Sequence, residues 1–150
     1  MKDKYMKLAI KEANKAYQMG EVPVGAVIIK NDKVIAKAYN KKEKIGNVLG
    51  HAEIIAIKKA SKKNNNWRLD GCDIYITLEP CPMCASAIKQ SRITNIYFGL
   101  NNSDENNIKI VKSILKKDKI NCSCNISGGL FSSEIENLMK NFFLSCRNKK

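Results

Sequence analysis

The sequence predicts an α/β protein in which a central mixed sheet of about five strands carries helices on both faces. Short apolar runs typical of strands alternate along the chain with longer stretches of helical periodicity. The expected element order, αββαβαβαβα, is typical of a three-layer α/β/α arrangement and contains neither an internal repeat nor a linker. Since 150 residues is a common size for one domain, we expect residues 1–150 to form a single domain.

Four elements are expected in the first half of the chain. A helix over 2–19 comes first, and strands over 24–29 and 34–39 then form a hairpin. After a basic loop over 41–50, a second helix begins near His51 and ends at a run of three asparagines. The apolar face of the first helix consists of Met6, Ala9, Ala13 and Tyr17. The inward face of the second consists of Ile54, Ile55 and Ile57.

The second half is expected to add three strands and three helices. We expect the strands over 74–78, 96–98 and 123–126. A helix over 82–91 begins at a proline, whose missing N–H costs nothing in a first helical turn. A polar loop over 101–107 precedes a helix over 108–118. The apolar stripe of the last helix consists of Phe131, Ile135, Leu138 and Phe142.

The chain has a net charge of +13, from 27 Lys and Arg residues against 14 Asp and Glu residues. This charge indicates a polyanionic partner, most simply a nucleic acid. The alternative source of the charge is AT-biased coding, because Lys, Asn and Ile are abundant together. No stretch approaches the roughly 18 apolar residues of a membrane span, and the amino terminus has no apolar signal region. We therefore expect a cytoplasmic protein with no membrane association.

Two short segments contain the residues that indicate chemistry, Gly50-His51-Ala52-Glu53 and Glu79-Pro80-Cys81-Pro82-Met83-Cys84. Cys81 and Cys84 are neighbours in the first turn of a helix, whose positive end favours the metal-binding thiolate. His51 is the only histidine in the chain. Three protein ligands plus water are typical of catalytic zinc, whereas structural zinc sites use four ligands. We therefore expect one catalytic Zn²⁺ per chain, held by His51, Cys81 and Cys84.

The remaining cysteines offer a fourth ligand only in principle. Cys72 precedes the strand over 74–78, which should carry it to the opposite end of the sheet from Cys81. We interpret Cys72 as structural, because cytosolic thiols stay reduced and nothing indicates secretion. The same interpretation applies to the other scattered cysteines, which are Cys122, Cys124 and Cys146.

Glu53 is the candidate catalytic residue. It lies two positions after His51, and side chains two apart on a helix do not share a face. Glu53 is therefore poorly placed as a metal ligand but well placed beside a metal-bound water. Zinc can lower the pKa of such a water to about 7, and a carboxylate can then transfer its proton.

His51-Ala52-Glu53 followed by Pro80-Cys81-Pro82-Met83-Cys84 resembles the signature of the zinc-dependent nucleobase deaminases. Nearly the whole chain is similar to the bacterial tRNA adenosine deaminases. The Trp-Arg-Leu element and the final Phe-Phe…Arg element are more specific to this branch than the zinc signature is. The segments in the family's order are Glu21-Val22-Pro23-Val24-Gly25-Ala26-Val27, Tyr39-Asn40, His51-Ala52-Glu53-Ile54, Trp67-Arg68-Leu69, Tyr75-Ile76-Thr77-Leu78-Glu79-Pro80-Cys81, Ser91-Arg92-Ile93, Phe142-Phe143 and Arg147.

The resemblance implies a cytidine-deaminase-like fold and a homodimer that converts the wobble adenosine of a tRNA anticodon loop to inosine. Glu53 would pass a proton from the zinc-bound water to the purine ring, hydroxide would attack C6, and ammonia would leave. Asn40 would bond the flipped base, its alternative role being a turn residue that ends the hairpin. The backbone around Ala52 would help to line the pocket. Because the anticodon loop is already single-stranded, extruding its base is inexpensive.

Two segments depart from the family's pattern. Relatives usually carry Asp-Pro-Thr-Ala before the histidine, where this chain has Asn47-Val48-Leu49-Gly50. Asn102 lies in the loop over 101–107 where the usual Asp would fall. Both segments border the nucleic-acid cleft in the family, so the departures concern RNA contacts and leave the zinc chemistry untouched. The basic candidates for RNA contact are Lys41, Lys42, Lys44, Arg147, Lys149 and Lys150.

Two other functions remain as alternatives at this stage. A guanine deaminase, or another free-base or nucleoside deaminase, would share the zinc signature but not the charge or the branch-specific elements. A catalytically silent RNA-binding subunit would not need the intact set of His51, Glu53 and the cysteine pair.

Overall fold

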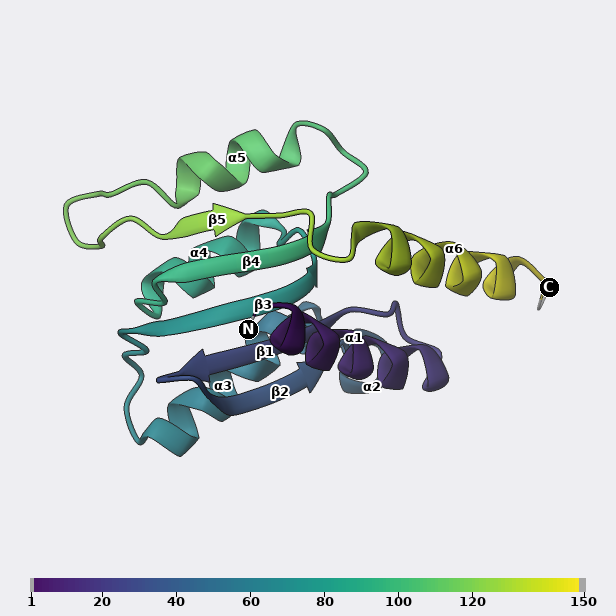
Figure 1. The fold of residues 1–150 in the computed structure, drawn as a ribbon, viewed down its shortest axis with the longest axis horizontal. Helices are drawn as coiled ribbons and strands as arrows, with labels where there is room; N and C mark the ends of the chain where they lie inside the picture. The colour runs from purple at the N-terminus through teal and green to yellow at the C-terminus, as the bar shows by residue number, and fades with distance from the viewer. Residues whose placement is uncertain (1, 149–150) are drawn as a thin grey trace.

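A five-stranded sheet with strand order β2-β1-β3-β4-β5 lies at the centre of the computed structural model, which describes residues 2–148 (Figure 1). Strand β1 pairs antiparallel with both β2 and β3, whereas β3, β4 and β5 run parallel to one another. The sheet is therefore mixed, as the sequence predicts. The strand bounds are β1 Gly25–Lys30, β2 Lys33–Tyr39, β3 Cys72–Leu78, β4 Asn95–Leu100 and β5 Asn125–Ser127.

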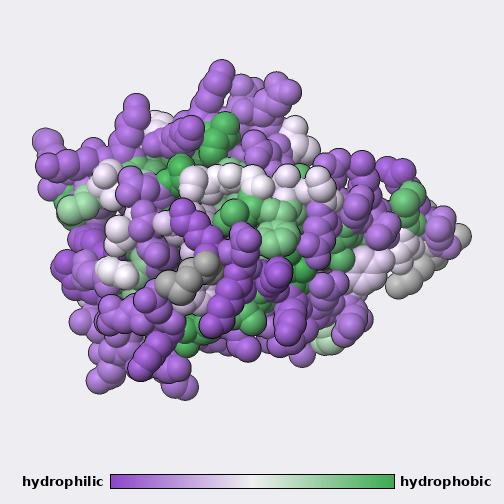
Figure 2. Space-filling view, in the orientation of Figure 1, coloured by the Kyte–Doolittle hydropathy of each residue, from purple (hydrophilic) through white to green (hydrophobic). Residues whose placement is uncertain are grey.

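Helices cover both faces of this sheet, which confirms the predicted three-layer fold. One face carries α1 (Lys2–Gln18) and α6 (Ser132–Asn148), and α6 contacts β4 before it projects beyond the sheet (Figure 1). The other face carries α3 (Ala52–Asn64), α4 (Pro82–Gln90) and α5 (Asn107–Ile114). Within the described residues, no helix combines the length and apolar character needed to span a membrane. Hydrophilic residues dominate the surface seen in Figure 2.

The side chains of the central strands alternate between two apolar cores. In β1, Ala26 and Ile28 face the helices α3 and α4, whereas Val27 faces α1. In β3, Ile74 faces the first core and Tyr75 the second. Such alternation follows from the two-residue period of a strand, and burial of both faces explains why these segments are almost continuously apolar.

Helix α3 packs on the sheet chiefly through alanines, and two of the three predicted inward-facing isoleucines, Ile55 and Ile57, pack against the same core. Ala52, Ala56 and Ala60 are fully buried at four-residue spacing, whereas Ile54, Ile55 and Ile57 are only partly buried. The helix backbone therefore approaches β1 and β2 more closely than an isoleucine stripe would allow.

The structure also corrects the predicted loop over 41–50 and the predicted end of the helix over 108–118. The segment over 41–50 contains a short helix, α2 (Lys42–Ile45), and a 3₁₀ helix, η1 (Val48–Gly50). Helix α5 ends at Ile114, four residues before the predicted end at 118. The reason is Asp118, whose carboxylate accepts hydrogen bonds from the backbone N–H groups of Ile120 and Asn121 and so stabilises a turn. Of the predicted stripe on α6, Ile135 and Phe142 are buried.

Substitution Ala56→Leu tests the close packing of α3. The added methylenes have no space against the sheet, so we expect the free energy of unfolding to fall by about 1 to 3 kcal/mol in urea denaturation. Lys58→Leu adds the same side chain on the exposed face of α3 and should change that free energy by no more than about 0.5 kcal/mol. Equal stability of the two variants would show that α3 packs loosely.

Candidate metal and catalytic site

The site lies at one end of the strands, beyond the carboxyl ends of β2, β3 and β4. These three strands run in the same direction, because β1 is antiparallel to both β2 and β3 and because β4 is parallel to β3. Asn40 directly follows β2, Cys81 follows β3 and Asn102 follows β4. Loop residues beyond the carboxyl ends of strands are a common position for binding sites in α/β sheets.

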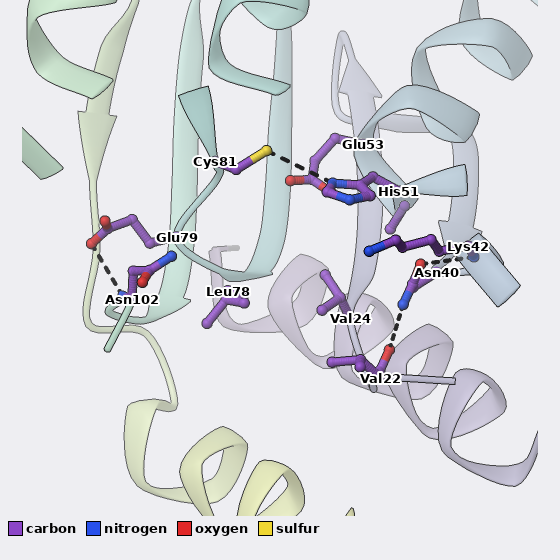
Figure 3. A pocket seen from close by; sticks show the side chains of 11 residues that line it. Val22, Val24, Asn40, Lys42, His51, Glu53, Leu78, Glu79, Cys81 and Asn102 are labelled. Carbon is purple, nitrogen blue, oxygen red and sulfur yellow. Dashed lines mark hydrogen bonds between the residues drawn. The ribbon is translucent and has the colours of Figure 1, made fainter. Parts of the chain in front are cut away.

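The structure brings the three predicted metal ligands together. His51 occupies the N-cap position of α3, Cys81 occupies that of α4, and Cys84 lies in the first turn of α4. The Nδ1 atom of His51 is 3.7 Å from the Sγ atom of Cys81, as the dashed line in Figure 3 marks. The same Nδ1 atom is 3.4 Å from the Sγ atom of Cys84. The potential ligand atoms of all three residues lie within 4.8 Å of one another. Cys72 is the first residue of β3 and therefore lies at the opposite end of that strand from Cys81.

The protonation states of the two thiols are linked. The pKa of Cys81 is lowered to about 4, first because the Cys84 thiol donates a hydrogen bond to it. The pKa of Cys84 is raised, first by that same hydrogen bond and then by burial. The hydrogen bond to Cys81 also raises the pKa of His51. Without a cation only one of the thiols is readily ionised, and a bound divalent metal would favour the thiolate form of both.

Glu53 lies beside the metal ligands without belonging to their group. Its side chain is buried in the first turn of α3, and burial raises the pKa of its carboxyl group. Figure 3 shows the carboxylate turned toward Cys81 and the His51 ring. A carboxyl group with a raised pKa next to a metal can both accept and donate a proton near neutral pH.

A cavity of about 200 Å³ opens beside these residues (Figure 3). Asn40 lies in its wall, where the Asn40 side chain donates a hydrogen bond to the carbonyl of Val22 (3.1 Å) and accepts one from the N–H of Lys42 (3.0 Å). Asn40 thus serves the turn and faces the cavity at the same time, and Ala52 lines the cavity at the start of α3. The full lining comprises Val22, Val24, Asn40, Lys42, His51, Ala52, Glu53, Leu78, Glu79, Cys81 and Asn102.

A buried carboxylate that we did not predict, Glu79, connects the metal-ligand segment to the loop over 101–107. Its oxygens accept hydrogen bonds from the side chain of Asn107 and from the N–H of Asn102, the latter at 3.4 Å. Asn107 also donates to the carbonyl of Pro80 at 3.0 Å. The segment before Cys81 contained the signal for Glu79, whereas Asn107 stands in no motif and was predicted to lie in the polar loop over 101–107.

Comparison with known proteins gives the family. The model of the MafB19-like deaminase family matches residues 1–147. A tRNA-specific adenosine deaminase of Bacillus subtilis is 39% identical over 146 residues, which span 97% of this chain and 91% of that protein. One from Aquifex aeolicus is 40% identical over 120 residues, or 80% of each chain.

Solved structures agree with these relatives. One from a study of A-to-I editing by tRNA:A34 deaminases at the wobble position of transfer RNA superposes with a TM-score of 0.82. It is 34% identical, and the match covers 90% of this chain and 98% of that one. A guanine deaminase from Nitrosomonas europaea has a TM-score of 0.76 at 18% identity, over 93% of this chain and 83% of that one, so it shares the fold alone.

The fold and the site together define a deaminase with the cytidine-deaminase-like architecture. Its sheet and its group of His51, Cys81 and Cys84 are those that the sequence led us to expect of this class. The chain belongs to the MafB19-like deaminase family and, within it, to the tRNA-specific adenosine deaminases.

Removing a thiol tests the metal group. Cys84→Ala should lose tightly bound metal, because two remaining ligands hold a divalent cation weakly. Cys72→Ala also removes a buried cysteine, but that cysteine lies at the opposite end of β3. This variant should retain about one metal ion per chain. Elemental analysis of the freshly purified proteins measures both. Equal metal content in the two variants would exclude Cys84 as a ligand.

Proposed function

We propose that the protein hydrolyses the wobble adenosine of a tRNA anticodon loop to inosine and ammonia, with one Zn²⁺ per chain. The observation that carries this proposal is that a chain 39% identical to a tRNA-specific adenosine deaminase over almost its whole length brings His51, Cys81 and Cys84 together beside Glu53. Because its substrate is a tRNA, the proposal also implies a cytoplasmic enzyme.

The residues present fit zinc. One imidazole and two thiols, with no fourth protein ligand in the group, are the donor set of an open zinc site. Zinc in such a site lowers the pKa of a water molecule to about 7 and so supplies a nucleophile at neutral pH. His51, Cys81 and Cys84 would hold the ion beside the cavity, which His51 and Cys81 help to line.

Glu53 would carry the proton in the reaction. Its carboxylate would accept a proton from the water whose oxygen bonds C6 and deliver that proton to the purine ring. The second proton of that water would then pass by way of Glu53 to the amino group, which leaves as ammonia while C6 becomes a carbonyl. Burial favours this role because it raises the pKa of Glu53 toward the working pH. The same burial keeps bulk water away from the carboxylate, so the proton it holds is not lost to solvent.

The cavity wall would hold the base. Asn40 has one amide hydrogen and one carbonyl lone pair free after its two hydrogen bonds, so it can pair with an edge of the purine. The backbone around Ala52 would line the pocket beside it. Since about 200 Å³ is less than the roughly 300 to 1,000 Å³ of a site for a drug-sized ligand, the cavity suits one base. The sugar and phosphates of the substrate would therefore stay at its mouth.

The homodimer is part of the same proposal and is supported by the family resemblance. Light scattering across a concentration series would measure the oligomeric state.

Deamination of a defined RNA tests the function. An anticodon stem-loop with adenosine at the wobble position should be converted to inosine, which is sequenced as guanosine, whereas the same RNA with guanosine there should be unchanged. Free guanine, adenosine and cytidine are the controls for the alternative activity. Turnover of free guanine without turnover of the stem-loop would replace the proposal with a free-base deaminase.

Glu53→Gln tests the assignment of the proton carrier. We expect this variant to retain zinc and RNA binding and to lose turnover by at least about 10²-fold, because the amide cannot accept the proton. Elemental analysis, RNA binding and inosine formation are measured on the same preparation. Loss of zinc from Glu53→Gln would mean that Glu53 acts as a ligand or orients one.

A further inference from the structure

Within residues 2–148, Lys42 is the only lysine or arginine that lines the catalytic cavity. Its side chain is exposed and extends from α2 toward the cavity on the side of His51 (Figure 3). Among the described residues Lys42 forms no ion pair. Of the other two basic residues predicted in this loop, Lys41 places its ammonium 4.8 Å from the Tyr39 ring centroid, and Lys44 does not line the cavity. Of the six residues predicted to contact RNA, Lys42 therefore lies at the cavity, whereas Lys149 and Lys150 lie outside the described residues.

The carboxylate of Glu21 fixes the backbone of the segment that contains Lys42. The Glu21 carboxylate is buried and accepts hydrogen bonds from the N–H groups of Glu43 (3.0 Å) and Lys44 (2.8 Å). The N–H of Lys42 itself is bonded to the Asn40 side chain. The backbone donors at the start of this short helix are therefore already used, so an anion that approaches it can be bound only by the side chain.

Gly50 fixes the same segment from the other side. The N–H of Lys41 donates to the carbonyl of Gly50 at 2.8 Å. A Cβ atom on Gly50 would lie 2.6 Å from the Cα atom of Lys42, which is closer than real side chains approach. Because Gly50 directly precedes His51, this contact holds Lys42 next to a metal ligand.

We infer that Lys42 binds the phosphate next to the extruded nucleotide and thereby favours adenosine within an RNA chain over free adenosine. The inference rests on the proposed function. A base that fills the cavity leaves its flanking phosphates at the mouth, within the region that Lys42 faces. The two cavity carboxylates do not compete for the ammonium, since Glu79 is bonded to Asn107 and Glu53 is turned toward the metal ligands. Lys42 therefore determines specificity and takes no part in the bond changes.

The test combines protein variants with RNAs that lack one charge. Wild type, Lys42→Ala and Lys42→Arg are assayed on the anticodon stem-loop and on two versions in which the phosphate 5′ or 3′ of the adenosine is an uncharged methylphosphonate. Lys62→Ala is the control, because Lys62 is an exposed lysine in the last turn of α3, far along that helix from His51. Zinc content and thermal midpoint confirm that each variant is folded.

We expect Lys42→Ala to raise KM about three- to tenfold, a larger change than in kcat, and to make the salt dependence of log(kcat/KM) shallower by about 0.7, the value for one contact to a single strand. Lys42→Arg should remain close to wild type. One methylphosphonate should raise KM for wild type but not further for Lys42→Ala, because both changes remove the same contact.

Two results would overturn the inference while leaving the proposed function intact. One is a KM for Lys42→Ala equal to that of Lys62→Ala. The other is an effect of Lys42→Ala that adds fully to that of each methylphosphonate. Wild-type protein that deaminates no stem-loop would overturn the proposed function and, with it, this inference.

Discussion

Two thiols and a carboxylate lie with one imidazole at a mostly buried end of the sheet, where burial opposes the accumulation of their negative charges. Cys81 ionises easily because Cys84 donates a hydrogen bond to it, and for the same reason Cys84 resists ionisation. Burial opposes the charge of Glu53 as well. His51 and the cysteines begin two helices, whose positive ends compensate for only part of this charge. A bound divalent metal would compensate for the rest, so the proposed zinc would depend on the elements that hold these groups together.

Buried carboxylates hold the two loops that border the cavity. Glu21 bonds backbone N–H groups of α2, and Glu79 bonds Asn107 and the N–H of Asn102. Neither carboxylate forms an ion pair within the described residues, although the chain has 27 Lys and Arg residues. Fixed main-chain and amide donors satisfy a buried carboxylate without the entropy cost of ordering a lysine. The lysines consequently stay at the surface, where they are available to a polyanion.

The sequence predicted the strands, the layers and the metal ligands, because each depends on patterns within a few residues. Alternating apolar runs specify strands that are buried on both faces, and a pair of cysteines in the first turn of a helix specifies neighbouring thiols. The early end of α5 accompanies a local turn at Asp118, whereas the other errors have a tertiary origin. Alanines are the fully buried residues of α3 and isoleucines are only partly buried, which depends on how closely the helix approaches the sheet and is contained in no local pattern. The carboxylate of Glu21 bonds the backbone of α2 at Glu43, which is twenty-two residues further along the chain. Asn107 is buried and bonds Glu79 and the carbonyl of Pro80, which lie 28 and 27 residues earlier in the chain.

The segments that depart from the family's pattern do not include His51, Glu53, Cys81 or Cys84, so we expect them to affect the approach of RNA rather than the chemistry. These four residues lie at the starts of α3 and α4, although Gly50 directly precedes His51 and Glu79 bonds the N–H of Asn102. In contrast, Gly50 stands where relatives usually carry alanine, and its missing Cβ is what admits the backbone of Lys42. The segment before the histidine and the position of Lys42 are therefore one structural unit, so a change in either alters the other. RNA specificity could vary through this unit while His51, Cys81 and Cys84 keep their positions, because the starts of α3 and α4 set those positions.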